Sequence, residues 1–565
     1  MKSKFTFLSL SNPIRKSLFI IIPVMAFSFN TTIAQCWQWA TGLGGADMET
    51  PTSAAVDPNG HMAITGEFIG TAVFGTYTLV ATSGRDVFTV LLDSSGVVMN
   101  AMGGVGDGPE NIGTGVAFDA NGNVFITGNF TGTISFGDVT LESAGSGDIF
   151  IVKYDAGGDL LWAQQAGGSS DILAHDIAVD NAGNCYIIGD FYDTAIFGDK
   201  TTYSTSAQDV FTVKYDADGY ALWAASCGST SSDIGTGISV DDAGNVYIAG
   251  YFQSEFIFGG VAYGTAGNRD VFVAKMDEDG NPLWATVGGG SSNDFFNKIA
   301  VDAGGNDIYV TGEFESYTAD IDGTILTNTN QSVPRRDIML LNFDALGSAR
   351  WGMSTGSAEH DYSNDVTTDD NGDVYITGIF QEAIIFGNTT LTNNDLYIAK
   401  YDSTGNSLWA KGSTYNSALA ASNSIATFKN RPIIAGDFVA GSGPPIAVFD
   451  NDTIISNGSL DVFLARVGPP CRQDVTGIDL RNNTDGGFDV YPNPFSQELN
   501  IRSNEKLRSI DVSMYNSQGQ LILFNQAHNA ENFTVPTEQL PAGVYFLNVK
   551  SGDAIQSIKV VKVEK

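Results

Sequence analysis

Apolar and polar residues alternate in short runs along most of the chain, and one such run recurs at a regular spacing. Clear copies are IAVDNAGNCYIIGDF at 177–191, ISVDDAGNVYIAGYF at 238–252 and VTTDDNGDVYITGIF at 366–380. Alternation with a period of two residues indicates strands with one buried face. The D-x-x-G-N/D segment between the two apolar runs supplies the residues of a tight hairpin turn. Each copy therefore predicts two antiparallel strands.

The recurring run has seven copies, spaced about 61 residues apart. A third strand is expected after a longer loop, as in DVFTVKYD at 209–216, and a fourth carries the L-W-A of Trp223. A four-stranded unit cannot bury both of its faces alone, so we predict a radial array, a seven-bladed β-propeller. The glycines that end the second strands mark the copies: Gly66, Gly128, Gly189, Gly250, Gly312, Gly378 and Gly436.

The two ends of the repeat array predict how the ring closes. The seventh copy stops after its third strand at 461–468, whereas 36–40 (CWQWA) is a fourth strand without the three that should precede it. We expect this N-terminal strand to complete the seventh blade, which would leave no exposed edge. Aligned with the second blade, Cys36 and Cys471 fall at neighbouring positions of one turn, which predicts a disulfide between them.

The repeats resemble the SBBP family of bacterial β-propeller repeats, whose pattern is D-x-x-G-N-x-Y-x-x-G followed by D-x-F-x-x-K-Y-D. The resemblance covers residues 37–468 and implies the propeller fold more than any activity. Two departures occur: Asn100 stands where the first blade should have its tryptophan, and the seventh blade lacks the Asp-Gly turn.

The first 34 residues predict a secretory signal peptide that is cleaved after Ala34. Basic residues precede an apolar run at 17–29, which is too short to span a bilayer. No later run is long enough, so the mature protein is expected to have no transmembrane segment.

The C-terminal part predicts a small β-sandwich of alternating strands with Gly and Pro turns. Its segments VYPNPF at 490–495 and LPAGVYFLNV at 540–549 resemble the C-terminal sorting domain of type IX secretion, found in Bacteroidetes-type bacteria. This resemblance implies the type IX machinery as a partner and a secreted or outer cell-surface location. The expected organisation is signal peptide 1–34, propeller 35–471, linker 472–489 and sorting domain 490–565.

The net charge of −36 arises from the propeller region, because the basic signal region and the neutral C-terminal module contribute no acidic excess. An acidic body repels phosphate backbones, so nucleic acid is excluded as a partner. This composition favours solubility in an extracellular medium, with cation binding as the alternative.

An aspartate starts every third strand, on the face where the longer loops gather. Carboxylates among glycine-rich loops suit Ca²⁺, which takes about six to eight oxygen ligands. The alternative is that each aspartate caps backbone N–H groups of its own turn, which is favoured for a residue repeated in every blade. Apart from Ca²⁺ we expect no cofactor. The seven candidates are Asp86, Asp148, Asp209, Asp270, Asp337, Asp395 and Asp461.

Few residues on this face depart from the repeat, and none forms a known catalytic motif. Arginines there could hold the carboxylate of a sugar or of a peptide terminus, or pair with the aspartates. The regular repeats favour a secreted, non-catalytic binding or adhesion module for a glycan or protein over a polysaccharide hydrolase or lyase, and we assign no catalytic residue. The ligand-face candidates are Arg85, Arg269, Arg335, Arg336, His175 and His360.

Overall fold

The computed structural model describes residues 35–563 except 393–394, 414–417, 441–445, 451, 457, 471–487, 492–494, 496–497, 516–520, 538–539, 542 and 552–553. The proposed signal peptide, Cys471 and most of the proposed linker therefore lie outside the described residues. Within these limits the chain is all-β, and it divides into two compact units on either side of the boundary between Cys471 and Arg472. No helix in the described part is long and apolar enough to cross a membrane.

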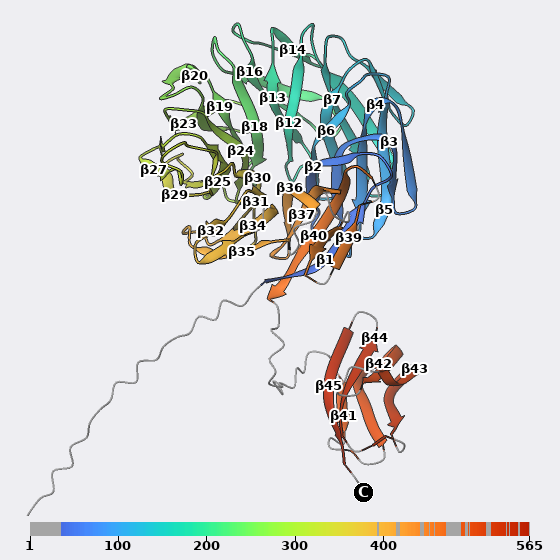
Figure 1. Cartoon of the computed structure of the whole chain (residues 1–565). Coiled ribbons are helices and arrows are strands. Elements are labelled where there is room, and N and C mark those ends of the chain that lie inside the picture. The colour runs from blue at the N-terminus through green and yellow to red at the C-terminus, as the bar shows by residue number, and fades with distance from the viewer. Residues whose placement is uncertain are drawn as a thin grey trace, which may run out of the picture. The chain divides into compact units, whose positions relative to one another are not determined.

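The first unit contains seven four-stranded antiparallel arrangements among its described residues, here called blades 1 to 7 (Figure 1). Their first strands gather toward the middle of the unit. Blade 1 has β2 (Glu49–Val56), β3 (Met62–Phe74), β4 (Tyr77–Leu92) and β5 (Val98–Gly106); blade 2 has β6 (Ile112–Phe118), β7 (Val124–Phe130), β10 (Asp148–Tyr154) and β11 (Leu160–Ala166); blade 3 has β12 (Ile172–Val179), β13 (Cys185–Phe191), β16 (Asp209–Tyr215) and β17 (Ala221–Cys227).

The remaining four blades follow the same order of strands. Blade 4 has β18 (Asp233–Val240), β19 (Val246–Phe252), β22 (Asp270–Met276) and β23 (Pro282–Gly290); blade 5 has β24 (Asp294–Val301), β25 (Ile308–Phe314), β28 (Asp337–Phe343) and β29 (Ala349–Thr355); blade 6 has β30 (Tyr362–Thr368), β31 (Val374–Phe380), β34 (Asp395–Tyr401) and β35 (Ser407–Gly412); blade 7 has β36 (Ala418–Phe428), β37 (Arg431–Ala440), β40 (Asp461–Pro470) and β1 (Gln35–Leu43).

The second and third strands form the core because both of their faces are covered. Every residue of β13 and of β16 is buried. Their apolar side chains pack against the neighbouring blade, as Phe211 of blade 3 and Ile151 of blade 2 do in one cluster. The predicted turns are present: Gly183 has φ of 82°, and the Asp180 carboxylate accepts the backbone N–H of Asn184 at 2.9 Å. Local turn chemistry therefore sets the hairpins, and packing between blades buries them.

The N-terminal strand β1 lies in blade 7, at the edge of the sheet order β1-β40-β37-β36. Its register places Trp39 opposite Arg466, as Trp162 lies opposite Lys153 in blade 2. The first strand of blade 7 is in turn hydrogen-bonded to that of blade 1, because Asn423 Nδ2 donates to the Pro51 carbonyl at 2.8 Å.

The connections between second and third strands are hairpins rather than the open loops expected from the sequence. In blade 1 the hairpin continues β3 and β4 themselves. The hairpin of blade 2 pairs with β5 of blade 1, and that of blade 5 with β23 of blade 4, so each covers the outer strand of the preceding blade. Strands of three or four residues are too short for alternation to reveal them. They are β8 (Thr133–Phe136) and β9 (Val139–Glu142), β14 (Thr194–Phe197) and β15 (Lys200–Tyr203), β20 (Glu255–Phe258) and β21 (Val261–Gly264), β26 (Thr318–Ile321) and β27 (Thr324–Thr327), β32 (Ile384–Phe386) and β33 (Thr389–Leu391), and β38 (Ile446–Phe449) and β39 (Asp452–Ile455).

The second unit is a small antiparallel β structure in which the described strands form one five-stranded sheet. Its order is β41-β42-β44-β45, and β43 also pairs with β42. Leu499, Val512 and Val549 belong to its buried core. The strands are β41 (Phe488–Tyr491), β42 (Glu498–Tyr515), β43 (Leu521–Pro536), β44 (Gly543–Ser551) and β45 (Ala554–Lys562).

Candidate functional site

Cationic and aromatic side chains alternate across blades 4, 5 and 6 on the face that carries the connections between second and third strands. We call Tyr251, Arg269, Phe295, Arg336 and Tyr362 the arginine–aromatic row. The Arg269 guanidinium carbon lies 5.5 Å from the centre of the Tyr251 ring and 5.8 Å from that of Phe295. The Arg336 carbon lies 4.8 Å from Phe295 and 5.5 Å from Tyr362. Both guanidinium groups therefore lie over aromatic rings, the geometry of cation–π attraction.

The repeat places these side chains at the same end of neighbouring blades. Phe295 and Tyr362 each follow the acidic residue at the start of a first strand, and each arginine directly precedes the aspartate at the start of a third strand. Arg269 forms a parallel β-bridge with Asn293, which brings the end of one blade's loop beside the next blade's first strand. Blade 4 thus contributes Tyr251 and Arg269, blade 5 contributes Phe295 and Arg336, and blade 6 contributes Tyr362.

The two arginines of the row have different charged neighbours. Arg336 Nε donates to Glu315 Oε1 at 2.9 Å. Burial raises the pKa of Glu313 to about 7, although the Arg336 guanidinium opposes that shift. Burial would also raise the pKa of Glu315, but hydrogen bonds from Asn293 and Arg336 outweigh it and lower the pKa. Arg269 is exposed and, among the residues that the structure describes, has no carboxylate within ion-pair distance.

Two further candidates lie beside the row. Arg335 Nη1 is 3.5 Å from His360 Nε2, and His360 Nδ1 accepts the backbone N–H of Arg336 at 3.2 Å. The His360 ring stacks against Tyr362 with centres 6.3 Å apart. The structure therefore brings four of the six predicted ligand-face residues together.

The other two ligand-face candidates are paired elsewhere. Arg85 Nη1 in blade 1 donates to both carboxylate oxygens of Glu67, at 2.8 Å and 3.1 Å. His175 Nε2 in blade 3 is 2.5 Å from Asp190 Oδ1. Each has a carboxylate partner within its own blade, so neither joins the row.

The aspartates that start the third strands accept hydrogen bonds from their own loops. The backbone N–H of Thr82 donates to Asp86 at 3.0 Å, that of Ala144 to Asp148 at 2.7 Å, and that of Thr205 to Asp209 at 2.8 Å; Ala266 donates likewise to Asp270 and Thr329 to Asp337. Asp395 accepts the N–H of Leu396 and the hydroxyl of Ser413. Burial raises the pKa of Asp395 to about 7. Asp86 and Asp395 accept hydrogen bonds on both carboxylate oxygens. No group of three or more His, Cys, Asp or Glu suited to a metal is found in the described part of the chain.

A bulge interrupts every first strand, and the sequence pattern did not reveal it. Several bulge side chains reach the next blade: Asn297 Nδ2 donates to the Ser363 carbonyl at 2.9 Å, and Asn364 Nδ2 to the Ser422 carbonyl at 2.9 Å. The His175 side chain instead contacts Asp190 of its own blade. In blade 5 the available signal was a polar residue that interrupts an apolar run, Asn297 in DFFNKIAV. The bulge residues are Thr52, Thr114, His175, Thr236, Asn297, Asn364 and Asn423.

One ionisable cluster next to the bulges also escaped the sequence analysis. Lys298 Nζ of blade 5 lies 2.7 Å from Asp176 Oδ1 of blade 3. Blade 4, between them, has Gly237 at the equivalent position. Asp365 of blade 6 accepts the N–H of Ile425 at 2.8 Å, and burial raises its pKa to about 6, against the effect of Lys298. Asp176 likewise accepts the N–H of Ile238. These carboxylates join blades through backbone groups, which is a structural role.

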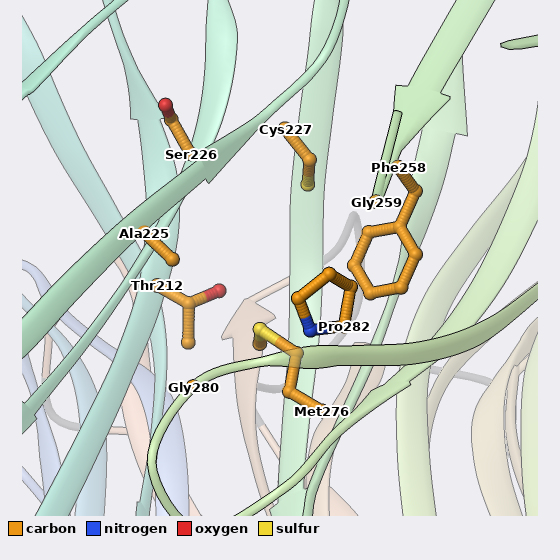
Figure 2. A pocket seen from close by; sticks show the side chains of 9 residues that line it. All are labelled: Thr212, Ala225, Ser226, Cys227, Phe258, Gly259, Met276, Gly280 and Pro282. Carbon is orange, nitrogen blue, oxygen red and sulfur yellow. The ribbon is translucent and has the colours of Figure 1, made fainter. Parts of the chain in front are cut away.

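Two cavities lie away from the row. A cavity of about 320 Å³ is lined by the turns after the first strands of blades 1 to 3, including Pro58 and Asp119. A second, of about 50 Å³, lies between blades 3 and 4, where Cys227 and Met276 line it (Figure 2). It is too small for a ligand beyond a water or two. Cys227 and Cys185 are free thiols, and burial raises the pKa of both, that of Cys185 to about 12, so neither is a nucleophile at neutral pH.

Comparison with protein families confirms both resemblances seen in the sequence. Residues 161–190 and 226–251 match a β-propeller repeat, and residues 489–563 match a secretion system C-terminal sorting domain. The chain therefore carries SBBP β-propeller repeats and a sorting domain, and it is a secreted or outer cell-surface protein.

Curated relatives share only part of their length with the chain. An uncharacterized WD repeat-containing protein of Acanthamoeba polyphaga mimivirus is 23% identical over 78% of this chain, and a regulatory protein, FlaEY, of Caulobacter vibrioides is 27% identical over 28%. The chain spans 40% and 17% of these relatives. A solved fungal alcohol oxidase of the AA5 family in complex with copper covers 93% of this chain and 99% of its own at 12% identity, with a TM-score of 0.31. A tetra-tandem repeat of a large adhesion protein covers 92% of this chain and 100% of its own at 11% identity, with a TM-score of 0.11. Neither structural similarity is strong enough to support an argument.

Proposed function

We propose that the secreted chain is a non-catalytic binding module, a closed seven-bladed propeller whose arginine–aromatic row holds a carboxylated glycan. The observation that carries this proposal is Arg269: an exposed guanidinium between two aromatic rings, without a carboxylate partner in the described residues, on a chain of net charge −36. A surface this acidic leaves few sites for an anion, and the row brings two guanidinium groups together on the loop-bearing face.

The chemistry of the row suits a sugar acid. Guanidinium groups bind carboxylates through two parallel hydrogen bonds, and the partly exposed rings of Tyr251 and Tyr362 beside them offer apolar surface to a sugar ring, whereas Phe295 is buried between the two arginines. Stacking on Tyr251 and Phe295 also holds the Arg269 fork in place, so less side-chain freedom is lost on binding. A peptide C-terminus carries the same carboxylate and is the competing ligand.

Ring closure by the N-terminal strand belongs to the same proposal. Trp39 of β1 packs on the turn at Gly96 of blade 1, as Trp162 packs on the turn at Gly219 of the next blade. The hydrogen bond from Asn423 to Pro51 continues the series made by the other bulge asparagines. A closed ring holds blades 4, 5 and 6 in fixed relation, which the row requires.

A disulfide between Cys36 and Cys471 would lock this closure. Cys471 lies outside the described residues, so the bond stays a prediction. It is supported by the pairing of Gln35 with Pro470, which places the two cysteines beside a paired position, and by Cys36 not being a free thiol. The proposed C-terminal β-sandwich, residues 490–565, would engage the type IX machinery, as its family match implies.

The polysaccharide hydrolase or lyase remains the alternative function. Its best support would be the ionisable cluster of Asp176, Lys298 and Asp365, which breaks the repeat next to the first strands. Lys298 pairs with Asp176, and both carboxylates accept backbone N–H groups of adjoining blades. We therefore assign no catalytic residue.

Calorimetric titration of the mature chain with trigalacturonate tests the binding proposal. Its fully methyl-esterified form, which lacks the carboxylates, is the ligand control. Arg269→Gln should weaken binding roughly 10- to 100-fold, the effect expected on removing a charged hydrogen-bonding partner. Arg85→Gln, the same change on the same face, should leave affinity unaltered.

Three results would contradict the proposal: equal binding by the Arg269→Gln and wild-type chains, equal binding of the esterified trisaccharide, or binding of a peptide with a free C-terminus but of no uronide. The last would keep the site and reassign its ligand.

A further inference from the structure

Pairs of acidic side chains meet where one blade passes to the next. At four of the junctions the aspartate at the start of a third strand faces an acidic residue at the start of the first strand of the following blade, 24 residues later in the chain wherever both lie on one continuous segment. The pairs are Asp209 with Asp233, Asp270 with Asp294, Asp337 with Asp361, and Asp461 with Glu49. We call them the junction carboxylates.

A glycine between the two strands lets the carboxylates converge. Asp209 Oδ1 and Asp233 Oδ2 lie 2.7 Å and 2.9 Å from the point that a Cβ on Gly228 would occupy. The corresponding distances at Gly289 are 2.5 Å for Asp270 Oδ1 and 2.9 Å for Asp294 Oδ2. Any larger residue at these glycines would fill the space between the two acids.

The junction carboxylates are buried and incompletely hydrogen-bonded. Asp233, Asp270 and Asp337 are 0%, 1% and 0% exposed. One oxygen of each accepts a loop N–H, but Oδ1 of all three has no hydrogen-bond partner in the part of the chain that is described. A buried acceptor without a donor costs free energy, and a second acid beside it adds repulsion.

The junction between blades 1 and 2 shows how the aspartate at this position is hydrogen-bonded when no second acid is present. Asn111 takes the place of the acidic residue there, and its Nδ2 donates to Asp86 Oδ1 at 3.0 Å. The backbone N–H of Gly106 donates to the same oxygen at 2.9 Å. An amide supplies the donor that a carboxylate lacks, so the acidic junctions need another positive partner.

Burial and mutual repulsion also raise the pKa values of these acids. The pKa of Asp233 rises to about 8 through burial and the nearby Asp209, and those of Asp294 and Asp361 rise to about 6 for the same two reasons. Raised pKa values are expected for acids that lack a nearby positive charge. The buried, unpartnered oxygens indicate the same need for a positive partner without reference to the pKa values.

We propose that each junction carboxylate pair binds one Ca²⁺ ion, which joins consecutive blades of the propeller. Ca²⁺ accepts carboxylate oxygens in flexible arrangements and completes its shell with backbone carbonyls and water, as a site with only two acidic side chains requires. Mg²⁺ demands a near-ideal octahedron and keeps most of its water, so it fits these buried pairs less well. The inference is independent of the ligand of the arginine–aromatic row.

The test compares the purified mature chain with the triple variant Asp233→Asn, Asp294→Asn, Asp361→Asn. The control triple Asp199→Asn, Asp218→Asn, Asp279→Asn removes the same charge from exposed positions. Calcium at about 10 mM against EDTA should raise the melting temperature of the wild type and the control by about 3 °C or more. The junction variant should show no calcium effect. In EDTA it should melt at or above the wild type, because its amides can donate as Asn111 does.

Bound calcium, measured by elemental analysis after dialysis, gives a second readout. The junction variant should hold three ions fewer per chain than the wild type, and Asp294→Asn alone should hold one fewer. An unchanged wild-type melting curve in calcium, a calcium response retained by the junction variant, or equal stabilisation by magnesium would each overturn the proposal.

Discussion

Replacing Gly280 with alanine tests how tightly neighbouring blades pack. Gly280 lies in the turn between the third and fourth strands of blade 4 and has φ of 81°. A Cβ there would lie 2.8 Å from the Trp223 ring of blade 3. The turn cannot simply move away, because Trp223 Nε1 donates to the Glu278 carbonyl of the same turn at 3.0 Å.

Two effects add in the Gly280→Ala variant. An L-residue held at positive φ costs about 1 kcal/mol. Overlap with a packed ring costs about 1–3 kcal/mol, since either the ring or the turn must shift. The unfolding free energy should therefore fall by about 2–4 kcal/mol.

Gly372→Ala is the matched control. Gly372 has φ of 78° in a turn of blade 6, and its Cβ would meet nothing within 4 Å. Only the backbone effect remains, about 1 kcal/mol. Urea unfolding, followed by circular dichroism and by tryptophan fluorescence, would measure both variants. Equal losses for the two would refute the reasoning, because they would show that the tryptophan gives way freely.

Four further outcomes are expected. Burial raises the pKa of Glu313 above its ordinary 4.5 to about 7, so its contribution to stability is complete at pH 4.5 and lost as the pH rises through 7; the Glu313→Gln variant should show a smaller fall in melting temperature between pH 5 and 8, and an unchanged pH profile would contradict this. Lys298→Met should destabilise the chain by about 3 kcal/mol at pH 8 and by less at pH 5, where Asp365 becomes protonated; equal losses at both pH values would show that the lysine is not the partner of these acids. Deleting residues 490–565 should retain the protein in the periplasm, and normal surface delivery, measured by cell fractionation, would rule out the sorting role. Non-reducing peptide mapping should find Cys36 joined to Cys471, whereas a free Cys36 or a link to Cys185 would break the closure proposal.

The sequence by itself predicts the four-stranded architecture of a blade and the export of the chain. Alternating residues and the Asp-x-x-Gly turns act over a few neighbouring residues, so a turn such as the one at Gly183 follows from local chemistry alone. Trp162 and Trp223 were recognised as markers of the fourth strand, although only the structure shows each donating to a carbonyl of the next blade. The sorting motifs were readable because they are short and contiguous.

The tertiary structure alone decided which repeated residues become a site. Arg85 and Arg269 occupy equivalent positions before a third strand, yet Arg85 meets Glu67 whereas Arg269 meets Tyr251 and Phe295. Part of the difference lies within the blade, whose second strand carries Glu67 in blade 1 and Tyr251 in blade 4, and part lies in the next blade, which contributes Phe295 beside Arg269. Contacts between blades join residues that no local pattern relates. The same holds for the docked hairpins, the bulge side chains and the junction carboxylates. A repeat determines the fold of each unit, but the packing of one unit against the next determines which of its side chains are left to bind.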